Sequence, residues 1–291
     1  MNLSMRQTRE RGFTLIEMLV AIGIFLLITG AAFTLLTSSQ QSYQTESQVL
    51  NSFQEARLGL DQMVRDINDA GFPPPTYLVS GNGNPFDYLA SVPFAWSTGA
   101  GYPVNACQIA TGGGGTCSTI TDPTPGDFDL IIETEPNPQD CPPNCVKWIR
   151  YQLGGPTGTT LMRGVADKRA GQDPDTSTSG GVLAPFVQNV VNNSPNLVIG
   201  QFKLATAYPV LFPGGAPVPI FQYICDTPTT PQNPPQLCSA PTTGPDNSPA
   251  NIRDVVITLI VAAPLPDSAT GRPRLVQLEG RGRRINPNQF E

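Results

Sequence analysis

The hydrophobic and polar positions of residues 13–70 form two successive helical patterns. Residues 18–36 carry no charge, which is about the length that spans the hydrocarbon core of a membrane as a helix. Apolar residues then recur every three or four positions as far as Ile67. No proline interrupts residues 13–70, and Gly71 is followed closely by three prolines. We therefore predict one helix over 13–70, with a membrane half and an amphipathic half.

After residue 72 the chain changes to short strand-like runs between segments rich in glycine and proline. Residues 146–153 alternate apolar and polar side chains, as expected for a strand with one buried face. Strands after one long helix are typical of an α+β domain, so we predict a mostly antiparallel sheet packed on the helix. The helix residues expected under the sheet are Val49, Phe53, Leu60 and Ile67. The other strand candidates are 127–133, 160–163, 182–191, 197–205, 218–224, 253–263 and 274–284.

Two loop segments, residues 209–249 and 112–115, have compositions that occur in binding sites. Eleven prolines between Pro209 and Pro249 predict an excursion outside the central sheet, which could form a partner-binding surface. Within it, Asp226, Asp246 and Asn247 offer oxygen ligands for calcium but lack an EF-hand pattern. The glycines at 112–115 are interpreted as a loop tip, because no Lys-Ser/Thr pair follows them as in a phosphate-binding loop.

Composition and charge exclude several function classes. The formal net charge of -6 argues against a nucleic-acid partner, and the absence of histidine removes the commonest general base and metal ligand. The carboxylate pairs Asp127 with Asp129 and Glu133 with Glu135 have no nucleophile or metal set nearby, so we expect solvated strand faces. We predict a protein that is not an enzyme and has no cofactor and no metal.

The six cysteines fall into three close pairs, which predict local disulfides formed in an oxidising compartment. Six cysteines allow fifteen connectivities, so nearest-neighbour pairing is only one possibility. A zinc site and free thiols are the alternatives, although only one pair has the short spacing of a zinc knuckle. The pairs are Cys107 with Cys117, Cys141 with Cys145, and Cys225 with Cys238.

Glu17 places a carboxylate within the apolar run that begins at Phe13. A membrane anchor with Glu17 at the membrane edge, or a secretory signal peptide, would explain the segment without further function. However, the sequence Arg11-Gly12-Phe13-Thr14-Leu15-Ile16-Glu17 resembles the processing and methylation motif of type IV prepilins and of type II secretion pseudopilins.

The resemblance implies a pilin-like fold and an ordered set of processing steps. A prepilin peptidase would cleave after Gly12 and methylate the new amino terminus of Phe13, which then pairs with Glu17 of a neighbouring subunit. The expected partners are that peptidase, other pilin or pseudopilin subunits, an inner-membrane assembly platform and, before assembly, membrane lipid. The expected segments are a leader at 1–12, a transmembrane and assembly helix at 13–36, its amphipathic continuation at 37–71 and a β-rich head at 72–291.

The order of elements in the head, with the fragment 147–153 followed by 161–163 and the fragment 254–259 before a last strand that ends at 281–284, also resembles that of large minor pilins of the PilW type and of J-type minor pseudopilins. The resemblance implies a location in the bacterial inner membrane with a periplasmic head, and then in a pilus or pseudopilus. The large soluble part after the helix favours a minor subunit at the tip or in a priming complex. A signal-anchored periplasmic binding domain that never polymerises is the alternative from another class. Arg281, Arg283 and Arg284 form a basic cluster that we interpret as a solvated strand end or as a contact with a subunit or an anionic surface.

Overall fold

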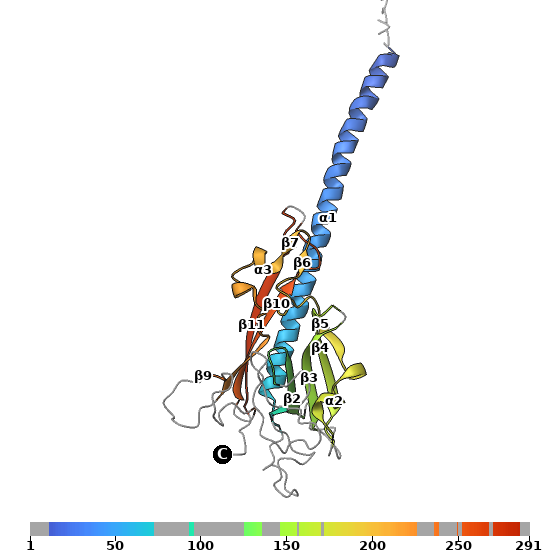
Figure 1. The fold of residues 1–291 in the computed structure, drawn as a ribbon. Coiled ribbons are helices and arrows are strands. Elements are labelled where there is room, and N and C mark those ends of the chain that lie inside the picture. The colour runs from blue at the N-terminus through green and yellow to red at the C-terminus, as the bar shows by residue number, and fades with distance from the viewer. Residues whose placement is uncertain are drawn as a thin grey trace, which may run out of the picture. The chain divides into compact units, whose positions relative to one another are not determined.

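The computed structural model contains one long helix, α1, which spans Leu15–Asn68 and therefore starts and ends two residues inside the predicted range (Figure 1). Gly71 follows its end with a left-handed φ of 82°, a conformation that glycine adopts without strain. The chain divides into two units, residues 1–47 and 48–291, and α1 contributes to both. The structure describes residues 12–72, 93–95, 125–135, 146–155, 157–169, 172–225, 236–238, 249, 252–267 and 270–285.

The unit of residues 48–291 contains antiparallel sheets and the C-terminal part of α1, which confirms the predicted α+β class. One sheet has the strand order β1-β2-β3-β4-β5, a second has the order β11-β10-β8-β9, and β6 pairs with β7. The first sheet comprises β1 (Phe94–Ala95), β2 (Asp129–Thr134), β3 (Lys147–Gly154), β4 (Thr160–Asp167) and β5 (Ala184–Val187). The others comprise β6 (Val198–Ile199), β7 (Phe202–Lys203), β8 (Phe221–Cys225), β9 (Gln236–Leu237), β10 (Ile252–Ala262) and β11 (Leu275–Arg283).

Short helices cover parts of this unit. The α-helical turns are α2 (Pro174–Ser177) and α3 (Leu204–Ala207), and two 3-10 helices span Gly180–Val182 and Pro213–Gly215. Asp173 caps α2, because its carboxylate accepts the backbone N–H groups of Asp175 and Thr176.

One continuous core joins both large sheets to α1. Leu60, Met63 and Ile67 of the helix belong to the same buried cluster as Tyr151 of β3 and Ile257 of β10. Of the helix residues predicted to lie under the sheet, Val49, Leu60 and Ile67 are buried and Phe53 is half-buried. The predicted apolar stripe is therefore the face by which residues 48–68 hold the two sheets together.

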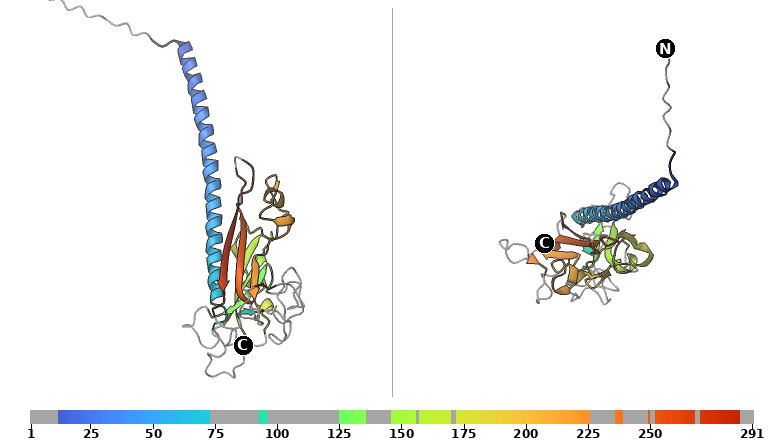
Figure 2. Two further views of the ribbon diagram at one scale, coloured as in Figure 1. Left: turned by 90° about the vertical axis from the view of Figure 1, so that its left-hand side faces the viewer. Right: turned by 90° about the horizontal axis from the view of Figure 1, so that it is seen from above.

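Glycines on β11 allow α1 to approach the strand closely. A Cβ atom added to Gly282 would lie 2.5 Å from Ile67 Cγ2, and one added to Gly280 would lie 2.8 Å from Leu60 Cδ1. The side chain of Asn68 also accepts the backbone N–H of Arg283 at 2.8 Å. Figure 2 shows β11 beside the C-terminal part of α1.

Three strand predictions need correction. Residues 197–205 do not form one strand, because Gly200, with φ of 64°, turns the chain between β6 and β7, and α3 follows. Only β5 forms within 182–191, since a 3-10 helix precedes it and Asn189 has a positive φ. The proline-rich segment 209–249 does contribute to the sheet: β8 lies between β10 and β9, because residues 220–227 contain no proline to remove a ladder hydrogen bond.

Candidate functional site

A capping box closes the N-terminus of α1. The Thr14 hydroxyl accepts the backbone N–H of Glu17 at 3.3 Å. In return, the Glu17 carboxylate accepts the backbone N–H of Thr14 at 3.3 Å and the Thr14 hydroxyl at 3.2 Å. This exchange satisfies two N–H groups that have no acceptor within the helix, and the positive end of the helix dipole also favours a carboxylate here. Glu17 therefore has a local structural role, for which Thr14-x-x-Glu17 is the sequence signal.

The apolar side chains of residues 13–36 are all exposed. The large apolar residues from Phe13 to Leu36 have exposed fractions between 53% and 80%. An 18-residue window of α1 has a mean hydropathy of 2.5, and none of it is buried. Among the described residues, α1 is the one helix long and apolar enough to cross a membrane. A helix that is apolar on every side needs lipid or other apolar helices around it.

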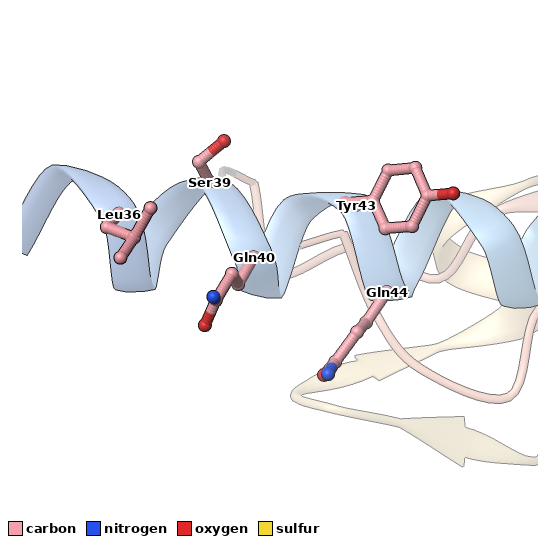
Figure 3. A pocket seen from close by; sticks show the side chains of 5 residues that line it. All are labelled: Leu36, Ser39, Gln40, Tyr43 and Gln44. Atoms are coloured by element: carbon pink, nitrogen blue, oxygen red, sulfur yellow. The ribbon is translucent and has the colours of Figure 1, made fainter.

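A shallow hollow lies on α1 where the apolar stretch ends (Figure 3). Its lining residues are Leu36, Ser39, Gln40, Tyr43 and Gln44, all from this one helix. Tyr43 is 75% exposed, so a small molecule seated here would keep most of its surface in water. Ligand pockets usually bury about 70–90% of the ligand, and we therefore assign no ligand to this hollow.

Arg150 of β3 organises a buried ion cluster. Its Nε donates to Asp129 Oδ1 at 2.9 Å and its Nη2 donates to Asp129 Oδ2 at 2.5 Å. The same Nη2 lies 2.7 Å from Asp175 Oδ1 of α2. Burial raises the pKa of Asp129 to about 6 in spite of these contacts. Burial also opposes the charge of Arg150, but its bonds to Asp129 raise its pKa, so Asp129 is the member that titrates.

Two further buried carboxylates hold elements together. Glu133 of β2 accepts from Trp148 Nε1 at 2.8 Å and from Lys168 Nζ at 2.7 Å. Asp66 of α1 accepts the Tyr151 hydroxyl at 2.5 Å and Arg163 Nη2 at 3.0 Å, which ties the helix to β3 and β4. Buried charges of this kind are tolerated only when they are paired.

The prediction of solvated strand faces was wrong for Asp129 and Glu133, which are 6% and 0% exposed. Their partners are Arg150 of β3 and Lys168, the residue after β4, and Arg150 also pairs with Asp175 of α2, so the pairing arises only in the folded chain. Every polar group of these clusters has a structural partner, and the clusters act as links between elements.

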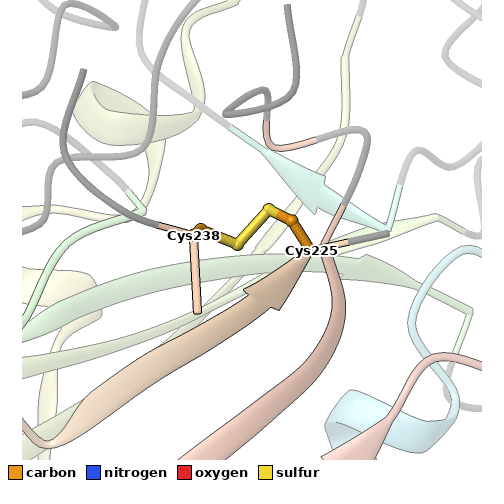
Figure 4. Close-up of a disulfide and its surroundings, with 2 residues drawn as sticks. All are labelled: Cys225 and Cys238. Atoms are coloured by element: carbon orange, nitrogen blue, oxygen red, sulfur yellow. A yellow bond between two sulfur atoms is a disulfide. The ribbon is translucent and has the colours of Figure 1, made fainter. Parts of the chain in front are cut away.

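The structure contains a disulfide between Cys225 and Cys238 (Figure 4). It joins the end of β8 to the residue after β9, and both cysteines are buried. The two strands beside it are thereby held as a pair in the second sheet. The other four cysteine candidates, Cys107, Cys117, Cys141 and Cys145, lie outside the described residues.

No group of metal-ligating side chains occurs in the part of the chain that the structure describes. The calcium candidates Asp226, Asp246 and Asn247 and the glycines at 112–115 lie outside it. Gly12 and Phe13 are its first two residues and are exposed. They precede α1, and Glu17 lies in its first turn; cleavage after Gly12 and methylation of Phe13 stay predictions.

The comparisons with known proteins point to the same end of the chain. Residues 7–33 match the prokaryotic N-terminal methylation motif. This match supports a type IV pilin-like or pseudopilin-like protein. Proteins with this motif are structural pilin subunits, and the motif implies processing by a prepilin peptidase and assembly with other pilin subunits. Neither the curated proteins nor the solved structures contain a match to this chain.

Proposed function

We propose that this protein is a minor pilin of a type IV pilus, inserted in the inner membrane with a periplasmic head, cleaved after Gly12 and N-methylated at Phe13. The observation that carries the proposal is the methylation motif at residues 7–33, which includes most of the exposed apolar part of α1. In this proposal residues 1–12 are the leader, 13–36 the assembly helix, 37–71 its continuation and 72–291 the head.

Processing changes the electrostatics of the helix start. Cleavage after Gly12 creates a positive α-amino group on Phe13, four residues before Glu17. A carboxylate in lipid is costly unless it is paired, and the amino terminus of a neighbouring subunit supplies the partner. Before assembly the Glu17 carboxylate accepts hydrogen bonds from Thr14 instead of pairing with an amino terminus. In our account assembly replaces part of this local bonding by an ion pair between subunits.

The size of the head supports a minor position at the pilus tip or in a priming complex. Residues 72–291 make up most of the chain, and a bulky head repeated along a shaft is harder to pack than one placed at the end. A J-type minor pseudopilin of type II secretion shares each of these features. The filament that incorporates the protein distinguishes the two.

The capping box allows a sharp test of the assembly role of Glu17. Glutamine at the same position keeps the cap, because either side chain completes a capping box, but it removes the charge. We expect Glu17→Gln and Glu17→Leu to reduce incorporation into sheared filaments at least tenfold while membrane insertion stays normal. Thr14→Ala, which weakens the cap and leaves the charge, should reduce incorporation less than threefold.

The measurement is the amount of the protein in the sheared filament fraction relative to the membrane fraction of its native host. If Glu17→Gln incorporates like the wild type while Thr14→Ala fails, the residue acts as a helix cap and the proposed ion pair is wrong. If neither the wild type nor any variant enters filaments, the non-polymerising anchored domain is the better description.

A further inference from the structure

Two arginines, Arg281 and Arg283, lie on the face of β11 that points away from the core. Along the strand, Gly280 and Gly282 face α1, whereas Arg281 and Arg283 alternate with them and point to the other side of the sheet. Arg281 and Arg283 are 55% and 70% exposed at their side chains. The alternation therefore gives one face to helix packing and the other to two exposed guanidinium groups.

A single buried carboxylate lies beneath these arginines. Asp254 of β10 is opposite Arg283 and is 1% exposed. Arg281 Nη2 lies 2.6 Å from Asp254 Oδ2 and Arg253 Nε lies 3.1 Å from it, while Arg283 Nε is 3.9 Å from Oδ1. Burial alone would raise the pKa of Asp254. The hydrogen bonds from Arg281 and Arg253 lower this pKa by more, so the carboxylate stays charged.

An irregularity in β10 brings the third arginine to the same face. The pairing of β10 with β8 shifts register between Ile252 and Asp254, which leaves Arg253 as the extra residue of a β-bulge. Three guanidinium groups thus lie around one buried carboxylate. The exposed Glu279 alternates with Arg281 on the same face of β11, so these five side chains carry a net charge of +1. Ion pairs at exposed positions add little stability, so the fold does not require both Arg281 and Arg283 on this face.

The floor next to the arginines is partly apolar. Val256 lies opposite Arg281 on β10, and Ile224 of β8 lies opposite Asp254; both are half-buried. A half-buried aliphatic centre with arginines at its side is the composition found in protein interfaces, where arginine is enriched and lysine is depleted. Two copies of this face placed against each other would bring arginine against arginine, which disfavours a symmetric pair.

We propose that the outer face of β8, β10 and β11 around Arg281 and Arg283 is a docking surface for an acidic face of a different protein chain. Charge complementarity selects the partner: the exposed pair Arg281 and Arg283 attracts carboxylates, and the planar guanidinium groups bind them through paired hydrogen bonds. Asp254 fixes Arg281 from below, so that this arginine is ordered before the partner arrives. The surface does not depend on processing at Gly12 and can exist in a subunit or in an anchored domain.

The test converts the arginines into reactive groups in the full-length protein in its native host. In an Arg281→Lys/Arg283→Lys variant, a water-soluble carbodiimide joins each new amine to a carboxylate in direct contact, without a spacer. The native pair Lys147 and Asp167 reports in the same sample that the reagent has acted, because its atoms are already in contact. The exposed native Lys203 reports random cross-linking between chains.

We expect mass spectrometry to find position 281 or 283 of the Arg281→Lys/Arg283→Lys protein joined to an aspartate or glutamate of another protein chain at least tenfold more often than Lys203. A charge reversal at the more distant arginine, Arg283→Glu, should lower the yield of this product from the Arg281→Lys protein at least fivefold. Lys203→Glu should change it less than twofold. Arg283 is 3.9 Å from Asp254 in the native protein and Arg281 is 2.6 Å from it, so the reversal changes the more distant of the two positions.

Three outcomes would overturn the proposal. The first is that positions 281 and 283 are joined only to Asp254 or Glu279 of the same chain, although the product of Lys147 with Asp167 shows that the reagent has acted. The second is cross-linking at Lys203 as frequent as at 281 and 283. The third is a combination of two results: no cross-link to another protein chain forms, and the Arg283→Glu protein no longer binds phosphatidylglycerol vesicles that the wild type binds. This would assign the arginines to a lipid surface.

Discussion

Replacing Gly282 by alanine tests the packing of α1 against β11. The added Cβ would lie 2.5 Å from Ile67 Cγ2 and 2.6 Å from Ile67 Cβ. Carbon atoms in good contact are about 3.5–4.0 Å apart, so the overlap is about 1 Å, and it involves a Cβ that no change of rotamer can move. Either α1 or β11 must shift. Overpacking of a core costs about 1–3 kcal/mol, and we expect Gly282→Ala to lie at the upper end of that range.

The assay is urea unfolding of the full chain in detergent, followed by tryptophan fluorescence, since Trp148 is fully buried. Gly154→Ala is the matched control: it is also a strand glycine, its added Cβ meets nothing within 4 Å, and we expect a change below about 0.5 kcal/mol. Equal stability of the two variants would refute the reasoning, because α1 could not then lie as close to β11 as described.

Two further predictions concern the buried ion cluster and the disulfide. Because the folded pKa of Asp129, about 6, is above its ordinary value of 3.8, the group stabilises the fold below about pH 4, and this contribution is lost as the pH rises through 6. Between pH 4.5 and 7 the unfolding free energy of the wild type should fall by about 2 kcal/mol relative to that of Asp129→Asn. A rise of the wild type relative to the variant over this range would contradict the raised pKa. The double variant Cys225→Ser/Cys238→Ser should lose about 3 kcal/mol in urea unfolding, from the loop of 13 residues that the bond closes, and an unchanged midpoint would exclude a structural role.

The helix and the long strands could be predicted because their signals are local. The spacing of apolar residues and the absence of proline define α1, and β10 and β11 were placed to within one residue at each end. The hairpin of β6 and β7 was missed because two-residue strands leave no alternation to detect; only Gly200 indicated the turn.

The buried charges could not be predicted from the sequence, since their partners are distant along the chain. Asp129 meets Arg150 and Asp66 meets Arg163 only when the first sheet has formed on α1. At the candidate site, Glu17 was recognised through its motif, whereas the capping box with Thr14 was overlooked although its spacing is visible in the sequence. A residue can thus have a local structural role and a proposed assembly role at once, and only a substitution that separates cap from charge distinguishes them.

The most direct test of the whole account is the intact mass and amino-terminal sequence of the protein recovered from the membranes of its native host. The account predicts a chain that begins at Phe13 and carries one added methyl group on its amino terminus. A chain that keeps Met1, or that is cut beyond the apolar stretch, would contradict the proposed processing after Gly12 and the pilin function that follows from it.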